Sequence, residues 1–209
     1  MIIKICGIKE KETLVCCEKN NVDFFGMIFY PKSPRNISKE RAKILLEFSK
    51  NFNIKGVGVF VNETFESICK YITDLKLSYI QLHGEEDNEY IKEIQKLNIK
   101  VIKKISIKEK FDLDKIDDFA DANYFLFDYK AEANELPGGN AKSFDWNLIK
   151  KLKIKKPWFL SGGINLSNIQ FIKSEIDPFG VDLSSGVEKD LGIKDIQTIN
   201  NFIGKINYA

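Results

Sequence analysis

The sequence contains a single histidine, His83, and few cysteines, of which Cys16 and Cys17 are adjacent while Cys6 and Cys69 stand alone. It has no Cys-x-x-Cys pair and no cysteine and histidine spacing typical of a zinc site, so we expect no metal. Two adjacent and two isolated cysteines also do not suggest a disulfide framework. Free thiols are therefore predicted throughout.

An excess of charge of one sign is also absent, since 32 lysines and arginines nearly balance 30 aspartates and glutamates. Without a basic field, a nucleic-acid partner is not expected. No apolar run approaches the roughly 20 residues of a membrane-spanning helix, and the apolar start of the chain is too short for a signal peptide. These absences predict a soluble, cytoplasmic protein with no membrane partner.

Nucleotide-binding motifs are missing. No G-x-G-x-x-G follows the first predicted strand, Gly56 and Gly58 lie inside another, and there is no Walker loop. The sequence therefore indicates no cofactor.

Eight short runs rich in isoleucine, valine and phenylalanine recur along the 209 residues, starting 21 to 34 residues apart. Several are apolar almost throughout, which is typical of parallel strands buried on both faces. The predicted strands are residues 2–6, 24–29, 55–61, 78–82, 99–105, 123–128, 157–161 and 179–183.

Segments with helical spacing of apolar residues lie between these strands, as where Phe65, Ile68 and Ile72 share one helix face. The later ones are predicted at 90–97, 113–119 (weaker), 146–152, 166–172 and 196–206. Eight strand-and-helix units with no linker predict an α/β protein, a single-domain (β/α)₈ TIM barrel over residues 1–209, in preference to an open doubly wound sheet.

Active sites of such barrels lie at the carboxyl ends of the strands. Two long intervals place extra loop at 30–37 and 129–143, where it would overhang that end. The polar or glycine residues that end or follow strands are Cys6, Arg35, Asn62, Gln81, His83, Asp128, Ser161, Gly162, Gly163, Asp182, Ser184, Ser185 and Gly186.

Cys6 and Asp128 are the candidate catalytic residues. Strand alternation puts Lys4 on the same inward side as the Cys6 thiol, where its ammonium would favour the thiolate. Asp128 ends an otherwise apolar strand, which should raise its pKa and suit a general acid. The alternatives are a buried apolar role for Cys6, and for Asp128 a structural carboxylate that pairs with Lys4 or caps the next loop.

Other strand-end residues suit substrate binding. Ser161-Gly162-Gly163 and Ser184-Ser185-Gly186 follow the last two strands, where barrels often bind phosphate through backbone N–H groups, although a lone Gly-Gly is more often a tight turn. Arg35 could hold a carboxylate through two parallel hydrogen bonds, or be a solvated surface side chain. His83 is a candidate base, but a hydrogen-bonding, orienting role is favoured.

Together these motifs resemble the phosphoribosylanthranilate isomerase family of tryptophan biosynthesis. They run in order from the first strand to the last: KICGI (4–8), SPRNI (33–37), GVFVN (58–62), QLHG (81–84), FD (127–128), PGG (137–139) with FDW (144–146), SGGI (161–164) and GVDLSSGVE (180–188).

The resemblance implies a cofactor-free Amadori rearrangement of a small-molecule substrate. Asp128 would be the general acid that opens the ribose ring, and Cys6 the general base that removes the C2 proton. Arg35 would face the anthranilate carboxylate, and the two glycine-serine loops would face the phosphate. Gln81, His83 and Asp182 are expected to contact substrate, in a monomer or homodimer.

Three alternatives remain. The related sugar isomerase of histidine biosynthesis performs the same rearrangement, but its family resembles this barrel with a carboxylate in place of Cys6. A Schiff-base aldolase or lyase would use Lys4 or Lys103. A non-catalytic phosphate-binding barrel would need neither Cys6 nor Asp128.

Overall fold

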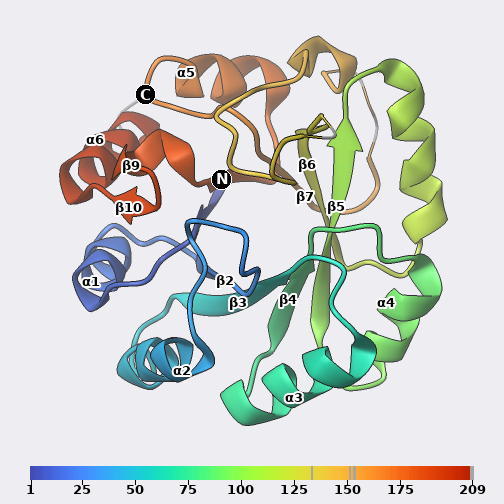
Figure 1. The fold of residues 1–209 in the computed structure, drawn as a ribbon. Helices are drawn as coiled ribbons and strands as arrows, with labels where there is room; N and C mark the ends of the chain where they lie inside the picture. The colour runs from blue at the N-terminus through green and yellow to red at the C-terminus, as the bar shows by residue number, and fades with distance from the viewer. Residues whose placement is uncertain (133, 151, 153, 208–209) are drawn as a thin grey trace.

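The computed structural model describes residues 1–132, 134–150, 152 and 154–207. Eight strands pair in parallel with their neighbours in sequence order, and β8 closes the barrel on β1 (Figure 1). The predicted fold class is therefore confirmed, and every predicted strand overlaps an observed one. The strands are β1 (Ile2–Cys6), β2 (Phe24–Ile28), β3 (Lys55–Phe60), β4 (Tyr79–Leu82), β5 (Lys100–Ile107), β6 (Tyr124–Tyr129), β7 (Trp158–Leu160) and β8 (Gly180–Leu183).

Helices form an outer ring around these strands. Ser38, Thr64 and Asp87 each cap a helix by accepting a hydrogen bond from a backbone N–H of its first turn. The α-helices are α1 (Lys11–Lys19), α2 (Lys39–Phe48), α3 (Phe65–Leu75), α4 (Asn88–Gln95), α5 (Ile169–Phe171) and α6 (Ile196–Asn207).

The structure differs from the predicted pattern in four regions. The weak segment at 113–119 is the 3₁₀-helix η1 (Lys110–Phe119), whose four aspartates have low helix propensity. The predicted helix at 146–152 is the short 3₁₀ turn η2 (Trp146–Leu148), and residue 151 lies outside the described residues. Helix α5 continues as the π-helix η3 (Ile172–Ile176). A hairpin, β9 (Glu188–Asp190) and β10 (Ile193–Lys194), follows a 3₁₀ turn, η4 (Ser185–Val187), and was not predicted.

The barrel interior is apolar at one end and polar at the other. Phe24, Val57, Ile102, Leu126 and Phe159 form a buried cluster separate from the main core between strands and helices. Because side chains alternate along each strand, the next inward-facing residue lies two positions further on, nearer the carboxyl end of the strand. The apolar cluster fills the interior at the amino ends of the strands, so a site can form only at their carboxyl ends.

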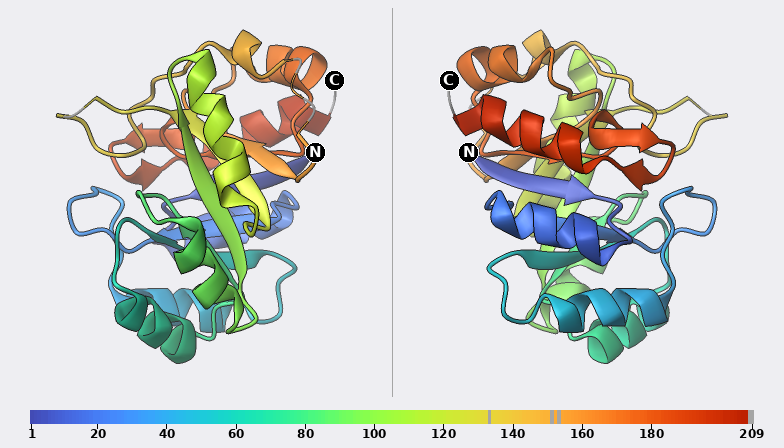
Figure 2. Two further views of the ribbon diagram at one scale, coloured as in Figure 1. Left: turned by 90° about the vertical axis from the view of Figure 1, so that its right-hand side faces the viewer. Right: turned by 90° about the vertical axis from the view of Figure 1, so that its left-hand side faces the viewer.

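The loops after β2 and β6, blue and yellow in Figure 2, project from this same end of the barrel, as predicted. Both contribute to the pocket described below, the first through Arg35 and the second through Leu136–Gly139. Among the described residues, no helix has the length and apolar character needed to cross a membrane.

Candidate active site

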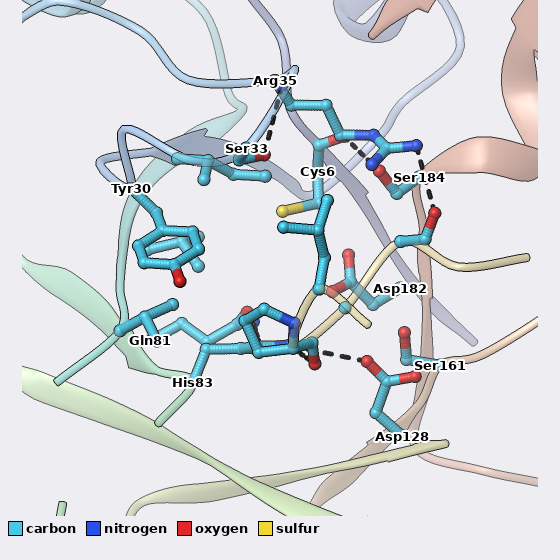
Figure 3. Close-up of a pocket in the computed structure, with 17 residues that line it drawn as sticks. Cys6, Tyr30, Ser33, Arg35, Gln81, His83, Asp128, Ser161, Asp182 and Ser184 are labelled. Atoms are coloured by element: carbon cyan, nitrogen blue, oxygen red, sulfur yellow. Dashed lines mark hydrogen bonds and ion pairs between the residues drawn. The ribbon is translucent and has the colours of Figure 1, made fainter. Parts of the chain in front are cut away.

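A pocket opens at the carboxyl ends of the strands, and most of the predicted site residues line it (Figure 3). Cys6 and Asp128 lie on opposite sides of this pocket, at the ends of β1 and β6. The predicted residues around it are Cys6, Arg35, Gln81, His83, Asp128, Ser161, Asp182 and Ser184. An adjoining pocket is lined by Gly162, Gly163, Ser185 and Gly186. Asn62 lines neither, because its side chain accepts a hydrogen bond from the backbone of Glu85.

Cys6 faces this pocket over a glycine of the neighbouring strand. Gly26 is its partner in the β1–β2 register, and a Cβ atom on Gly26 would lie 2.7 Å from the Cys6 sulfur. A side chain at position 26 would therefore displace the thiol. Glycine at this position leaves room for the sulfur to reach the cavity.

Burial raises the pKa of the Cys6 thiol, and the opposing effect of Lys4 is smaller. The prediction that Lys4 holds this pKa below its free value is therefore wrong. Lys4 lies inward as expected and lowers the pKa of the thiol, but its Nζ also donates to Asp182 Oδ2 at 2.9 Å, and this carboxylate raises the pKa of the thiol. The β1–β8 register sets this pair, because Lys4 and Asp182 are direct partners.

Asp128 is buried, and burial raises its pKa to about 6, as its apolar strand predicted. Its Oδ1 accepts a hydrogen bond from its neighbour's amide, Tyr129 N, at 2.8 Å. Its Oδ2 lies 3.6 Å from His83 Nε2. The alternative of a pair with Lys4 is wrong, because that ammonium binds Asp182.

His83 is held by hydrogen bonds at both ring nitrogens. Its Nε2 lies 3.1 Å from the Pro137 carbonyl oxygen, which can only accept, so Nε2 carries the proton. Its Nδ1 then accepts from the Gln81 side-chain amide at 2.8 Å. Burial and nearby lysines lower the pKa of His83 well below its usual value. Neither nitrogen is free to take a proton from a substrate, so the orienting role expected for His83 fits the geometry.

Arg35 is only 2% exposed, so the alternative of a solvated surface arginine is wrong. Its guanidinium already makes two parallel hydrogen bonds to a carboxylate, from Nε and Nη2 to Glu188, both at 2.8 Å. The remaining nitrogen, Nη1, faces Gly139, where a Cβ atom would lie only 2.3 Å away. A side chain at position 139 would therefore displace this end of the guanidinium.

Three charged residues at the site were not among the predicted site residues. Glu188 and Lys194, both in the unpredicted hairpin, form a buried ion pair of 2.7 Å, and Lys194 Nζ also donates to the Ser184 carbonyl. Lys104 donates to the Pro137 carbonyl at 3.0 Å. Glu188 could have been found in the sequence from its place in the GVDLSSGVE motif. The only sequence feature that distinguishes Lys104 is that it is a lysine within an apolar strand.

The glycine-serine loops after β7 and β8 are in direct contact. A Cβ atom on Gly186 would lie 1.9 Å from the Ile164 carbonyl oxygen, so only glycine allows the approach. Gly163 has a φ of 68°, and its carbonyl accepts from the side-chain amides of Asn165 and Asn168. A Cβ on Gly162 would lie 3.0 Å from Asp128 Oδ1, so the loops adjoin the candidate acid.

Two buried acceptor atoms at the pocket, Gln81 Oε1 and Asp182 Oδ1, have no hydrogen-bond partner among the described residues. Leaving a buried polar atom without a partner costs about 1–3 kcal/mol. Both atoms suit the hydroxyl groups of a bound ligand, which would satisfy them.

The lysines of the aldolase alternative are already paired. Lys103 Nζ binds Glu86 at 2.9 Å and the Gly84 carbonyl at 2.7 Å. The pKa of Lys4 is raised by Asp182 and Cys6 against the effect of burial. Neither side chain is placed as the neutral amine that Schiff-base formation needs. Among the described residues, no cluster of three metal-ligating side chains occurs.

Fold and site together define a (β/α)₈-barrel protein with a thiol and a carboxyl group across one pocket, beside two glycine-serine loops. A family model described as N-(5'phosphoribosyl)anthranilate (PRA) isomerase matches residues 3–205. The chain belongs to this family.

Named relatives match the chain over almost its whole length. The N-(5'-phosphoribosyl)anthranilate isomerase of Aquifex aeolicus is 41% identical over 202 residues, covering 96% of each chain. The crystal structure of phosphoribosyl anthranilate isomerase from Thermotoga maritima is 35% identical, with a TM-score of 0.90 and complete coverage of both chains. A structure of the isomerase in complex with reduced 1-(o-carboxyphenylamino)-1-deoxyribulose 5-phosphate is 34% identical, with a TM-score of 0.87 and complete coverage.

Proposed function

We propose that the protein is an N-(5'-phosphoribosyl)anthranilate isomerase of tryptophan biosynthesis. It would convert its substrate to 1-(2-carboxyphenylamino)-1-deoxyribulose 5-phosphate by an Amadori rearrangement. The observation that carries this proposal, beside family membership, is the placement of Cys6 and Asp128 across one pocket. An isomerisation that moves protons needs one group to give a proton and another to take one.

Asp128 acts first in this proposal. Its protonated carboxyl group gives a proton to the ribose ring oxygen, and the bond from that oxygen to C1 breaks. The nitrogen lone pair forms the C1–N double bond, giving an iminium ion. A pKa of about 6 keeps part of this carboxyl group protonated near neutral pH.

Cys6 then acts as the base. Its thiolate removes the C2 proton, and the electron pair of that bond forms a C1–C2 double bond while the iminium electrons return to nitrogen. The resulting enolamine tautomerises to the ketone by losing its hydroxyl proton and gaining a proton at C1. The iminium is a sufficient electron sink for a thiolate to act as the base.

The remaining polar groups bind the substrate. Arg35 Nη1 binds the anthranilate carboxylate beside Gly139. Gln81 Oε1 and Asp182 Oδ1, which lack partners, accept from the sugar hydroxyls. The loops containing Gly162, Gly163, Ser184, Ser185 and Gly186 hold the phosphate through their backbone N–H groups.

The direct test is a fluorescence assay of the purified protein with freshly formed phosphoribosylanthranilate. Substrate-dependent loss of anthranilate-type fluorescence, with formation of the ribulose product confirmed by mass spectrometry, supports the proposal. Turnover only of the phosphoribosyl amine of histidine biosynthesis would instead assign the related isomerase activity. Binding of both compounds without conversion would assign the non-catalytic barrel.

Ser185→Asp should weaken binding of a reduced product analogue by roughly tenfold or more, because a carboxylate in the loops proposed to hold the phosphate repels it. Ser185 avoids the strain that substitution of Gly163 would add at its positive φ. Calorimetric titration measures the dissociation constant, and Ser185→Ala is the matched control without charge. Equal affinity for both variants would place the phosphate elsewhere.

We further propose a cytoplasmic enzyme that acts on a free small molecule, as a monomer or homodimer. One related structure is described as monomers generated from the dimeric enzyme of Thermotoga maritima. Sedimentation equilibrium at micromolar concentration tests the assembly of this chain.

A further inference from the structure

Lys104 is a buried lysine that points into the barrel. It lies two residues after Ile102, which belongs to the apolar interior cluster, so strand alternation places both on the inward side of β5. Its Nζ donates to the Pro137 carbonyl at 3.0 Å. Among the described residues, no carboxylate lies within ion-pair distance of this ammonium. A buried cation without an anionic partner is costly, which argues for a use.

The Pro137 carbonyl links this ammonium to the site. The same oxygen accepts from His83 Nε2 at 3.1 Å, and His83 Nδ1 accepts from Gln81. The next residue, Gly138, packs against the ring, since a Cβ atom there would lie 2.5 Å from His83 Nε2 and 3.5 Å from Asp128 Oδ2. The loop after β6 is thus fixed over both His83 and the candidate acid.

We propose that Lys104 is a positioning residue of this site: its ammonium anchors the Pro137 carbonyl, holding the loop closed and His83 as the neutral Nε2–H tautomer beside Asp128. The inference rests on the proposed function where it concerns turnover. Its structural part, the tautomer and the anchored loop, stands on the geometry alone.

The charge of Lys104 also acts on its neighbours. The charged and titratable groups that face Asp128 are His83 on the β4 side, Lys104 from β5, Lys4 from β1 and Asp182 from β8. After burial, Lys104 has the largest effect on Asp128 and lowers its pKa. It also lowers the pKa of His83, which keeps the imidazole neutral.

The first experiment uses the fact that His83 is the only histidine. Its imidazole ¹⁵N signals in the uniformly labelled wild-type protein need no assignment, and they should show the neutral Nε2–H tautomer from pH 5 to pH 8. An Nδ1–H tautomer or an imidazolium at pH 7 would overturn the inference. This result depends on neither a variant nor any enzymatic activity.

The second experiment removes the ammonium. In Lys104→Met, the ¹³C carboxyl titration of Asp128 should move up by roughly one pH unit, because an attractive charge is lost. The KM should rise about tenfold as the loop that lines the pocket loosens. Lys104→Arg keeps the charge and should leave the Asp128 titration near that of the wild type. Lys115→Met removes an exposed lysine nearby and should change neither quantity.

Lys104→Met with an unchanged Asp128 titration and an unchanged KM would also overturn the inference. Failure of the proposed function looks different, because the wild-type protein itself would then not convert phosphoribosylanthranilate. Should Lys104→Met not fold, the wild-type ¹⁵N spectrum still tests the inference, because an Nδ1–H tautomer or an imidazolium at pH 7 would overturn it.

Discussion

Asp128→Asn should reduce kcat/KM for phosphoribosylanthranilate by roughly 10²–10⁴-fold, the contribution typical of a general acid. The amide keeps the size and shape of the carboxyl group but has no proton to give to the ribose ring oxygen. Single-turnover fluorescence kinetics measure the loss. Asp74→Asn, which changes an exposed aspartate on α3, is the matched control. Activity of Asp128→Asn within tenfold of the wild type would contradict the assignment.

The same substitution should stabilise the protein above pH 7. Burial raises the pKa of Asp128 from an ordinary value near 3.9 to about 6, so the folded state holds this proton more tightly than the unfolded state. The stability gained from that proton is complete below pH 4 and is lost as pH rises through 6. This difference corresponds to at most about 3 kcal/mol, and Asp128→Asn should avoid the loss.

Urea unfolding at pH 4 and pH 8 measures this effect. The free energies of unfolding of wild type and Asp128→Asn should be close at pH 4, and the variant should be the more stable at pH 8. A variant that is inactive and less stable at both values would indicate a structural carboxylate instead of a tuned acid.

The pH dependence of wild-type activity follows from the ionisation of Asp128 and Cys6. In the proposed mechanism the reactive form has Asp128 protonated and Cys6 ionised, whereas the pKa values of the two groups favour the reverse arrangement. Both forms carry one proton, so their ratio does not change with pH. Activity corrected for ionisation of the substrate phosphate should therefore rise through pH 6 and fall above the thiol pKa. The limb near pH 6 should vanish in Asp128→Asn.

The sequence allowed prediction of the strand order and of the strand ends that meet at the pocket. Apolar runs such as the one that ends at Asp128 predicted where the strands lie. The carboxyl ends of all strands in such a barrel lie at the same face. Cys6, Asp128 and Asp182 could therefore be placed around one pocket without coordinates. The raised pKa of Asp128 followed from the apolar residues before it, because burial is its largest cause.

Side-chain pairing across distant loops could not be predicted. Arg35 and Glu188 are 153 residues apart and meet only because the hairpin after β8 folds back toward the loop after β2. The predicted direction of the Cys6 pKa shift was wrong for a similar reason. Alternation placed Lys4 correctly, but the outcome depended on how deeply the thiol is buried and on Asp182 taking the ammonium.

Cys6→Ser should lose most of the activity, again by roughly 10²–10⁴-fold, because a hydroxyl group of similar size is far too weak a base near neutral pH. Cys6→Asp should retain some turnover, since a carboxylate can take the C2 proton. Cys69→Ser, on the half-buried face of α3, is the matched control and should be fully active. Stopped-flow fluorescence distinguishes these rates.

Alkylation is a second test of the role of the Cys6 thiol. Iodoacetamide should inactivate the protein with a rate that rises through a pKa above the ordinary value of about 8.5, because burial raises the pKa of Cys6. A bound product analogue should protect it. Full activity in Cys6→Ser would remove the thiol from the mechanism. It would not make His83 the base, since both of its nitrogens are engaged, and would direct attention to Asp182 Oδ1, a carboxylate oxygen at the pocket without a partner among the described residues.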